Sequence, residues 1–272
     1  MTDETRPEHY LWDNTLAEEK QRLDEQAAIW DPYTQRYIDK LGISAGWRCL
    51  EVGAGSGTMT AWLAERVAPG GSVVAGDIDT RFLAGLEHPA IETRQLDITS
   101  GEIEKDAFDL VYARMVLMHL PDSGKHLATM AAAVRPGGWL LVQDVDLGYL
   151  ESRHSTNYTW PVSNRRFAVR TAKALNALLS MTGASTSSVR EHPRRLFELG
   201  LEDIGAESVI RMEHGDPNGT FRKAYDRVKD YLVQYAGFPQ EDAEQRLRQM
   251  DDPKFTFSTG PMVSAWGRRP VR

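Results

Sequence analysis

Short apolar runs separated by longer mixed segments mark the central part of the chain. Four such runs lie between residues 47 and 146, at positions 49–52, 73–75, 110–112 and 140–142. The segments between them are long enough for helices, which we expect at 56–68, 81–86 and 124–134. Alternation of buried strands with helices is typical of a mainly parallel sheet. The pattern therefore predicts an α/β core that occupies about half of the chain.

Helical periodicity marks the segments on either side of this core. Apolar residues recur at near-helical spacing up to Asp31 and Pro32, so we expect an N-terminal helical cap over residues 1–45 that breaks at this pair. Residues 46–272 then form one domain with two helical insertions that act as lids. We expect the insertions at about 149–183 and 221–250, a further helix through 196–200, and strands at 207–212 and 263–266.

Composition narrows the class of protein. The 272 residues are 41% hydrophobic and 26% charged, which is ordinary for a globular chain long enough to bury a large core. A net charge of −7 argues against a broad surface for nucleic acid, because phosphate backbones are held by clustered Lys and Arg. The single cysteine, Cys49, allows no intrachain disulfide and indicates a reducing, cytoplasmic location. We expect no signal peptide and no membrane anchor.

A glycine turn follows the first apolar run. Residues 50–58 read Leu-Glu-Val-Gly-Ala-Gly-Ser-Gly-Thr, so the glycines lie at the carboxyl end of a strand, where open α/β sheets bind ligands. The dinucleotide fingerprint would need a glycine in place of Thr58, and the Lys-Ser/Thr ending of a phosphate loop is absent. Glu51 places a carboxylate beside the turn, which suits a ligand with positive charge. S-adenosylmethionine, with its sulfonium and ammonium groups, has that charge.

Acidic residues end the next two strands of the pattern. Asp77 stands 24 residues after the first glycine, the spacing at which a carboxylate accepts hydrogen bonds from ribose hydroxyls. Asp79 competes for that role, and either residue could instead cap a helix. Asp97 could accept the amino group of an adenine whose ring lies between Ile78 and Ile98, or it could be a turn carboxylate.

Six segments, taken together, resemble the ordered motifs of class I S-adenosylmethionine-dependent methyltransferases over roughly residues 47–146. They are 51–57, 76–79, 95–98, 108–114, 119–121 and 135–142. Residues 266–270 are similar to the final antiparallel strand of that family. The resemblance implies a Rossmann-like, doubly wound, seven-stranded sheet that is mainly parallel, with its last strand antiparallel, and S-adenosyl-L-methionine as the cofactor.

The resemblance also implies roles for individual residues. The turn would line the methionine part of the cofactor, Glu51 would hold its amino group, Asp77 its ribose, and Asp97 its adenine amine. Arg114 would pair with the carboxylate of the cofactor, or it could be a surface residue. The expected cofactor-binding residues are Glu51, Gly53, Ala54, Gly55, Gly57, Asp77, Ile78, Asp97, Ile98, Ala113 and Arg114.

Methyl transfer requires few catalytic groups, because the protein mainly aligns the reactants and excludes water. His119 follows the fourth strand and is the candidate general base, with a structural role as the alternative. His154 and Tyr158 are weaker candidates. Asp144 and Asp146 could face the same side of a strand, but without a third ligand we expect no metal site. Tyr10 and Trp12 are candidates for an N-terminal lid.

The function predicted from these features is methyl transfer to oxygen, nitrogen or carbon of a small molecule, in specialised metabolism for example. The alternative is a protein that binds S-adenosylmethionine without methylating, either a cyclase-type enzyme or a regulatory module. We expect no nucleic-acid or membrane partner, and a homodimer stays open. Aromatic residues of the two insertions suit a flat or apolar acceptor, although aromatic residues at helical spacing more often form a core. They are Tyr158, Trp160, Phe167, Tyr225, Tyr231, Tyr235 and Phe238.

Overall fold

A seven-stranded sheet forms the centre of the computed structural model, which describes residues 19–100 and 102–271. The strand order is β3-β2-β1-β4-β5-β9-β6. The strands are β1 (Arg48–Val52), β2 (Ser72–Asp77), β3 (Ile91–Gln95), β4 (Phe108–Arg114), β5 (Val134–Val145), β6 (Glu202–Val209) and β9 (Met262–Arg268).

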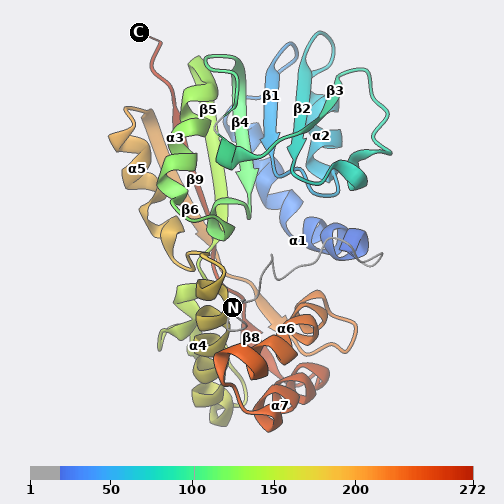
Figure 1. Cartoon of the computed structure of the whole chain (residues 1–272), viewed down its shortest axis with the longest axis vertical. Helices are drawn as coiled ribbons and strands as arrows, with labels where there is room; N and C mark the ends of the chain where they lie inside the picture. The colour runs from blue at the N-terminus through green and yellow to red at the C-terminus, as the bar shows by residue number, and fades with distance from the viewer. Residues whose placement is uncertain (1–18, 101, 272) are drawn as a thin grey trace, which may run out of the picture.

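Strand direction agrees with the seven-stranded prediction. The pairs among β1 to β5 are parallel, whereas β9 is antiparallel to both of its neighbours, β5 and β6. The last strand is thus the antiparallel one, and the fold class expected from the sequence is confirmed (Figure 1).

Helices cover both faces of the sheet. Side chains alternate along each strand: Leu50 packs into one core cluster together with α3 (Ser123–Ala133) and α5 (His192–Glu198), while its neighbour Cys49 packs into another. That second cluster contains residues of α1 (Glu19–Lys40) and α2 (Thr58–Val67). Burial on both faces explains why the central strands β1, β2 and β4 read as continuous apolar runs, whereas the edge strands β3 and β6 are largely exposed.

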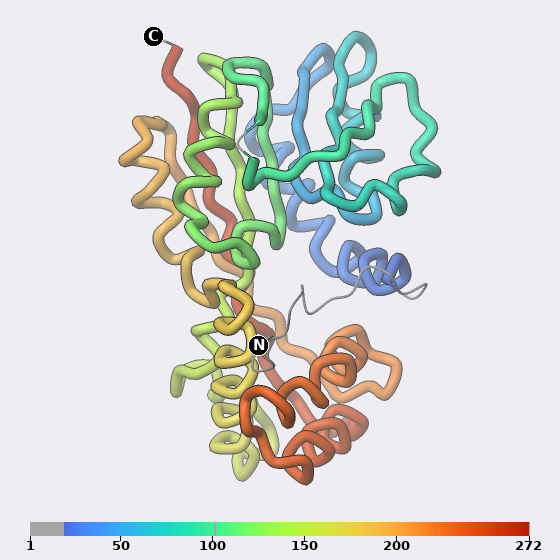
Figure 2. The backbone as a smooth tube through the Cα atoms, in the orientation of Figure 1, coloured from blue at the N-terminus to red at the C-terminus, as the bar shows by residue number. Residues whose placement is uncertain are grey.

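A helical lobe lies beyond the carboxyl end of β5. It contains α4 (Arg165–Met181), α6 (Thr220–Ala236), α7 (Gln240–Asp251), and a small sheet of β7 (Met212–His214) with β8 (Thr256–Ser258). The chain enters this lobe after β5, returns to the sheet at α5, leaves again after β6 and returns at β9 (Figure 2). The first half of α1 lies between the lobe and the sheet (Figure 1).

Several expected element boundaries are wrong. α1 continues through Pro32 to Lys40, because Tyr37 and Ile38, beyond the proline, are buried against the sheet and their packing outweighs the local preference. The expected helix at 81–86 is a short 3-10 turn, Thr80–Leu83. The strand expected at 207–212 is β6, which begins earlier and ends at Val209. Tyr10 and Trp12 lie outside the described residues.

Residues 135–138 follow the end of α3 at Ala133, and they fall within the bounds of β5. There Val134 pairs with Phe108 and Trp139 with Leu110, so residues 135–138 form an irregularity in the pairing of β4 with β5.

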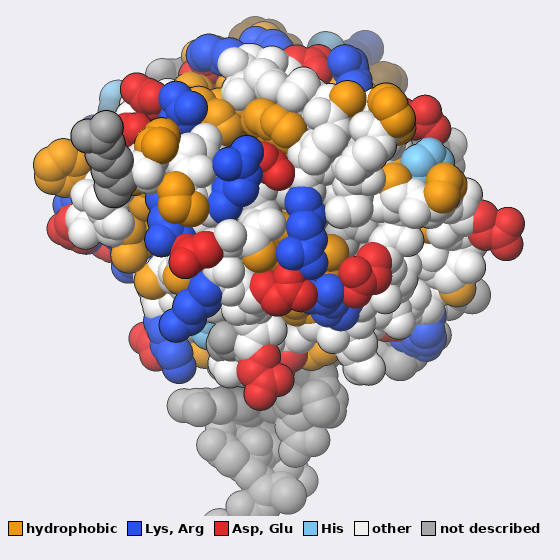
Figure 3. All heavy atoms as spheres, turned by 90° about the horizontal axis from the view of Figure 1, so that it is seen from above, with side chains coloured by type: hydrophobic (Ala, Val, Ile, Leu, Met, Phe, Trp, Pro, Cys, Tyr) orange, Lys and Arg blue, Asp and Glu red, His pale blue; other side chains and the backbone are white. Residues whose placement is uncertain are grey.

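Within the described part of the chain, no helix is both long and apolar enough to cross a membrane. Figure 3 shows the end of the molecule opposite the helical lobe, where acidic and basic side chains are interspersed.

Candidate functional site

The glycine turn between β1 and α2 has a backbone that only glycine adopts easily. Gly53, Gly55 and Gly57 have φ angles of +73°, +55° and +79°. A Cβ atom on Gly53 would collide with Val116, and one on Gly57 with the end of the Leu86 side chain, so neighbouring side chains already occupy the space beside these two glycines. A Cβ atom on Gly55 would lie in ordinary contact, 3.7 Å from Leu23 Cδ2. Gly55 is therefore the glycine whose missing side chain leaves room at the turn.

Asp77 joins the end of β2 to this turn. Its Oδ2 accepts a hydrogen bond from the backbone N–H of Gly55 at 2.8 Å, and its Oδ1 accepts one from the N–H of Asp79 at 3.0 Å. Burial raises the pKa of the Asp77 carboxyl. Asp79, in contrast, caps the turn that follows and pairs with Arg81 at 2.6 Å. Of the two competing carboxylates, Asp77 is the one at the glycine turn.

The expected adenine-binding residues differ in exposure. Ile78, next to Asp77, is 63% exposed and offers a free aliphatic surface. Ile98 is buried in the core cluster beneath the sheet, so its side chain is already packed. The Asp97 carboxylate is exposed and accepts hydrogen bonds from the N–H and hydroxyl of Thr99 at 2.8 and 2.6 Å. The structure thus places Ile78 and Asp97 at the surface and Ile98 in the interior.

Glu51 is buried on β1 just before the turn, with 4% of its surface exposed. The Thr60 hydroxyl of α2 donates to its Oε2 at 2.5 Å. Burial raises the pKa of Glu51 to about 8, although Thr60 and the Arg114 guanidinium favour the ionised form. In the ligand-free protein this carboxyl is therefore mostly protonated at neutral pH, and a cation placed beside it would ionise it.

The end of β4 is bound to α1. Ala113 is buried within the sheet, and the Arg114 guanidinium pairs with Asp31 at 2.6 Å and donates to the Thr34 hydroxyl at 2.9 Å. A cofactor carboxylate would have to share Arg114 with Asp31. Met115 follows with a φ of +54°, which is rare for a residue with a side chain and is typical of functional sites. Sequence reasoning missed Asp31, because a helix break was expected at that residue.

His119 lies in a 3-10 turn (Leu117–His119) just after β4. Burial and the nearby positive charge of Arg22 on α1 lower the pKa of its imidazole to about 4. The side chain is therefore neutral at physiological pH, as a general base must be, but it is only weakly basic.

The weaker catalytic candidates lie elsewhere. His154 and Tyr158 belong to the helical lobe, where Tyr158 is exposed. Asp144 is buried in β5, whereas Asp146 pairs with Arg190 at 2.7 Å. Among residues 19–100 and 102–271, no three His, Cys, Asp or Glu side chains form a group that could hold a metal ion.

A family model for methyltransferase domains matches residues 19–188, which include the whole glycine turn and the ends of β1, β2 and β4. The chain belongs to the methyltransferase domain family. The family resemblance inferred from the sequence is thereby confirmed.

Relatives of this methyltransferase domain are moderately similar. Methyltransferase GfsG of Streptomyces halstedii is 29% identical over 132 residues, which are 45% of this chain and 46% of that protein. The ubiquinone/menaquinone biosynthesis C-methyltransferase UbiE of Hahella chejuensis is 29% identical over 170 residues, 60% of this chain and 63% of that protein. The chain thus spans about half to two thirds of the length of these curated relatives.

Solved structures share the fold at low sequence identity. Phosphoethanolamine N-methyltransferase 2 of Haemonchus contortus, in complex with phosphomonomethylethanolamine and S-adenosylhomocysteine, has a TM-score of 0.54 and 16% identity, covering 92% of this chain and 57% of that one. The 4+2 cyclase SpnF has a TM-score of 0.51 and 17% identity, covering 89% and 84%. Since both a methyltransferase and a cyclase share the fold, the fold alone does not decide the reaction.

A cavity of about 450 Å³ lies between α1 and α6. Ion pairs bridge the two helices: the Lys223 ammonium pairs with Glu25 at 2.7 Å, and Arg227 pairs with the buried Glu19 at 2.9 Å. Arg22 lines the cavity, and its positive charge also lowers the pKa of His119, which follows β4. Its lining is Gln21, Arg22, Glu25, Lys223, Asp226, Arg227 and Lys229.

The aromatic residues of the two insertions do not line this cavity. Phe167, Tyr225 and Phe238 pack in the core of the helical lobe. Trp160 is 59% exposed, and Tyr231 stacks on Tyr235 near the surface. Phe167, Tyr225 and Phe238 therefore stabilise the lobe itself, whereas Tyr158, Trp160 and Tyr231 are exposed, and an apolar acceptor pocket stays a prediction.

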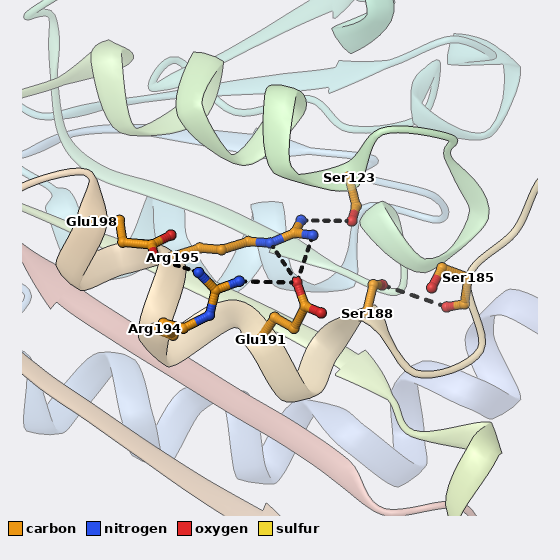
Figure 4. A network of polar contacts seen from close by, with 7 residues as sticks. All are labelled: Ser123, Ser185, Ser188, Glu191, Arg194, Arg195 and Glu198. Atoms are coloured by element: carbon orange, nitrogen blue, oxygen red, sulfur yellow. Dashed lines mark hydrogen bonds and ion pairs between the residues drawn. The ribbon is translucent and has the colours of Figure 1, made fainter.

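A smaller cavity of about 260 Å³ lies where the segment after α4 meets the start of α3. The Arg195 guanidinium donates to the Ser123 hydroxyl at 3.1 Å and pairs with Glu191 at 2.8 Å, so it ties α5 to α3 (Figure 4). Glu191 also pairs with Arg194 at 3.3 Å. Because the positive and negative charges of this network pair with one another, we assign the network a structural role.

Proposed function

We propose that this protein transfers the methyl group of S-adenosylmethionine to oxygen, nitrogen or carbon of a small molecule. The observation that carries the proposal is the glycine turn bound to Asp77 and flanked by the buried carboxyl of Glu51. This donor set fits the cofactor: it offers a glycine without a side chain at position 55, an acceptor for hydroxyl groups and a carboxyl that a cation would ionise. When bound, the cofactor supplies a methyl carbon already activated by the sulfonium.

The residues of the chain hold and orient the reactants in this proposal. Asp77 accepts hydrogen bonds from the ribose hydroxyls, Ile78 supports the adenine ring, and Asp97 accepts a hydrogen bond from the adenine amine. Glu51 holds the ammonium group, and its burial keeps competing water away. Gly53, Ala54, Gly57 and Arg114 complete the proposed cofactor site, and the buried Ile98 and Ala113 support it from the core.

The proposed acceptor site is the cavity between α1 and α6. Its charged lining suits a polar acceptor better than an apolar one. His119 is the proposed base where the acceptor must lose a proton; its imidazole is neutral and can accept one, although its lowered pKa makes it a weak base. A cytoplasmic location and a small molecule as the partner in place of nucleic acid remain part of the proposal, and composition supports both.

Two measurements test the proposal. Calorimetry should show binding of S-adenosylmethionine and S-adenosylhomocysteine to the purified protein and no binding of NAD. Incubation with the cofactor and a library of polar metabolites should then yield demethylated cofactor together with a product heavier by one methylene unit. Binding without any demethylated cofactor would favour the cyclase or the regulatory module, and absence of binding would overturn the proposal.

A further inference from the structure

Leu23, in the first half of α1, lies directly over the glycine turn. A Cβ atom on Gly55 would lie 3.7 and 4.0 Å from the two methyl carbons of the partly buried Leu23 side chain. Apart from the chain neighbours of Gly55, no other residue in the described part of the chain comes within 4 Å of that position. The room that Gly55 leaves at the turn is therefore bounded by Leu23.

The space between Gly55 and Leu23 is too narrow for an atom of a ligand. A bonded carbon stands about 1.5 Å from a Cα atom, whereas carbon atoms that are not bonded stay about 3.5 to 4.0 Å apart. A carbon bonded to Gly55 would already touch Leu23. A ligand atom on the same line has to stand about 2 Å further from Gly55 and would overlap the Leu23 methyl groups. The ligand-free protein thus holds a side chain where the proposed site needs the methionine part of the cofactor.

Ion pairs with α6 hold this part of α1 on the side of the helical lobe. The Lys223 ammonium pairs with Glu25 at 2.7 Å, and the two side chains are 39% and 24% exposed. Ion pairs with this exposure contribute little stability. The pair of Arg227 with the buried Glu19, at 2.9 Å, holds the start of the helix more firmly. The turn of α1 that carries Leu23 is therefore held less tightly than the turn before it.

A single hydrogen bond holds the same turn of α1 on the side of the sheet. The Gln26 side-chain amide donates to the Met115 thioether, with 2.9 Å between nitrogen and sulfur. A thioether is a weak acceptor, so this bond costs little to break. Leu23 is thus seated over the glycine turn by contacts that a ligand can replace.

We propose that Leu23 blocks the cofactor site of the ligand-free protein and that the methionine part of the cofactor displaces it. The inference rests on the proposed function, because it requires the glycine turn to be the cofactor site. Displacement of Leu23 uses part of the binding free energy, so the affinity is lower than it would be for the same site with this space open. Gln21, Arg22 and Glu25 of the same part of α1 line the proposed acceptor cavity. That cavity therefore takes its final shape only after the cofactor has bound.

Substitutions of Leu23 test the block through the sign of their effect. In calorimetry with the full chain, Leu23→Ala should bind S-adenosylhomocysteine about 3- to 10-fold more tightly than the wild type. Leu23→Phe should bind it at least about threefold more weakly, because a larger side chain fills more of the space. A leucine that only contacted the bound ligand would give weaker binding in Leu23→Ala.

Ile29→Ala is the matched control. Ile29 is also partly buried on α1, its substitution removes the same number of carbon atoms, and it is not among the nearest atoms to Gly53, Gly55 or Gly57. Its affinity for S-adenosylhomocysteine should stay within about twofold of the wild type, because the space over the turn is unchanged. Should Leu23→Ala fail to fold, Leu23→Val replaces it with the same expected sign, since its methyl groups stand one bond closer to the backbone.

Nuclear magnetic resonance follows the displacement directly. The nuclear Overhauser effect between the Leu23 methyl protons and the Gly55 α protons should be present in the ligand-free protein and absent from the complex with S-adenosylhomocysteine. Its persistence in the complex would overturn the block. Weaker or unchanged binding by Leu23→Ala, with binding by the wild type intact, would overturn the block and leave the proposed function standing. Absence of binding in both the wild type and Leu23→Ala would overturn the proposed function, and the block with it.

Discussion

Cofactor binding should release a proton from Glu51. The pKa of this carboxyl is raised from 4.5 to about 8 by burial, so at pH 7 about nine tenths of the ligand-free protein carries it protonated. An ammonium group held by Glu51 requires the ionised form. At pH 7 we therefore expect the release of about 0.9 protons for each ligand bound.

The affinity should follow the ionised fraction of Glu51. That fraction rises from about 1% at pH 6 to about 50% at pH 8, so the affinity for S-adenosylhomocysteine should rise about 50-fold over this interval. Calorimetry in two buffers of different ionisation enthalpy measures the number of protons released. Glu51→Gln is the matched control, because it keeps the shape and an acceptor for the Thr60 hydroxyl but cannot ionise.

Folding stability gives an independent check, because it should fall with rising pH whereas the cofactor affinity should rise. A raised carboxyl pKa contributes stability that is fully present below pH 4.5 and is lost as the pH rises to about 8. Relative to Glu51→Gln, the ligand-free wild type should therefore lose stability by about 1.4 kcal/mol per pH unit across this range. Equal proton release by the wild type and Glu51→Gln would refute the contact between Glu51 and the ammonium group.

Three further predictions concern the glycine turn, the proposed ribose-binding carboxylate of Asp77 and the candidate base His119. Asp77→Asn should weaken cofactor binding by about 10- to 100-fold, and Asp79→Asn by less than about threefold, because only Asp77 lies at the turn; similar affinities of the two variants in calorimetry would contradict this. Gly55→Ala and Gly46→Ala should both lose about 1 to 2 kcal/mol of stability from their positive φ angles, but only Gly55→Ala should lose cofactor binding, since nothing surrounds Gly46. His119→Ala should lower single-turnover methyl transfer by about 10²- to 10⁴-fold with unchanged cofactor affinity; a joint loss of affinity and melting temperature would show a packing role instead.

The sheet was predictable because its signal is local. Each buried strand is an apolar run, and the glycines and Asp77 stand in fixed positions at the strand ends. The site around Glu51 could also be anticipated, because residues at the carboxyl ends of neighbouring parallel strands converge.

Long-range contacts were not predictable from such patterns. The pairing of Arg114 with Asp31 joins residues 83 positions apart, and nothing in the local sequence around Asp31 indicates it. Pro32 is an unfavourable residue within a helix, yet tertiary packing on both sides of it keeps α1 continuous. The aromatic residues of the insertions show the same limit: their helical spacing indicates a buried face, but not whether that face lines a pocket or a core.

The path of the chain has a mechanical consequence. Four chain segments connect the helical lobe to the sheet, after β5, before α5, after β6 and before β9. A rigid-body swing of the lobe would have to bend all four segments together, whereas hinges in closing domains usually involve a few residues. The first half of α1 is joined to the sheet at one end only among the described residues, and the ion pairs from Glu19 and Glu25 hold it against α6. Ligand entry should therefore occur by release of α1, and added salt should accelerate it mainly by weakening the partly exposed pair of Lys223 with Glu25, because salt screens the pair of Arg227 with the buried Glu19 much less.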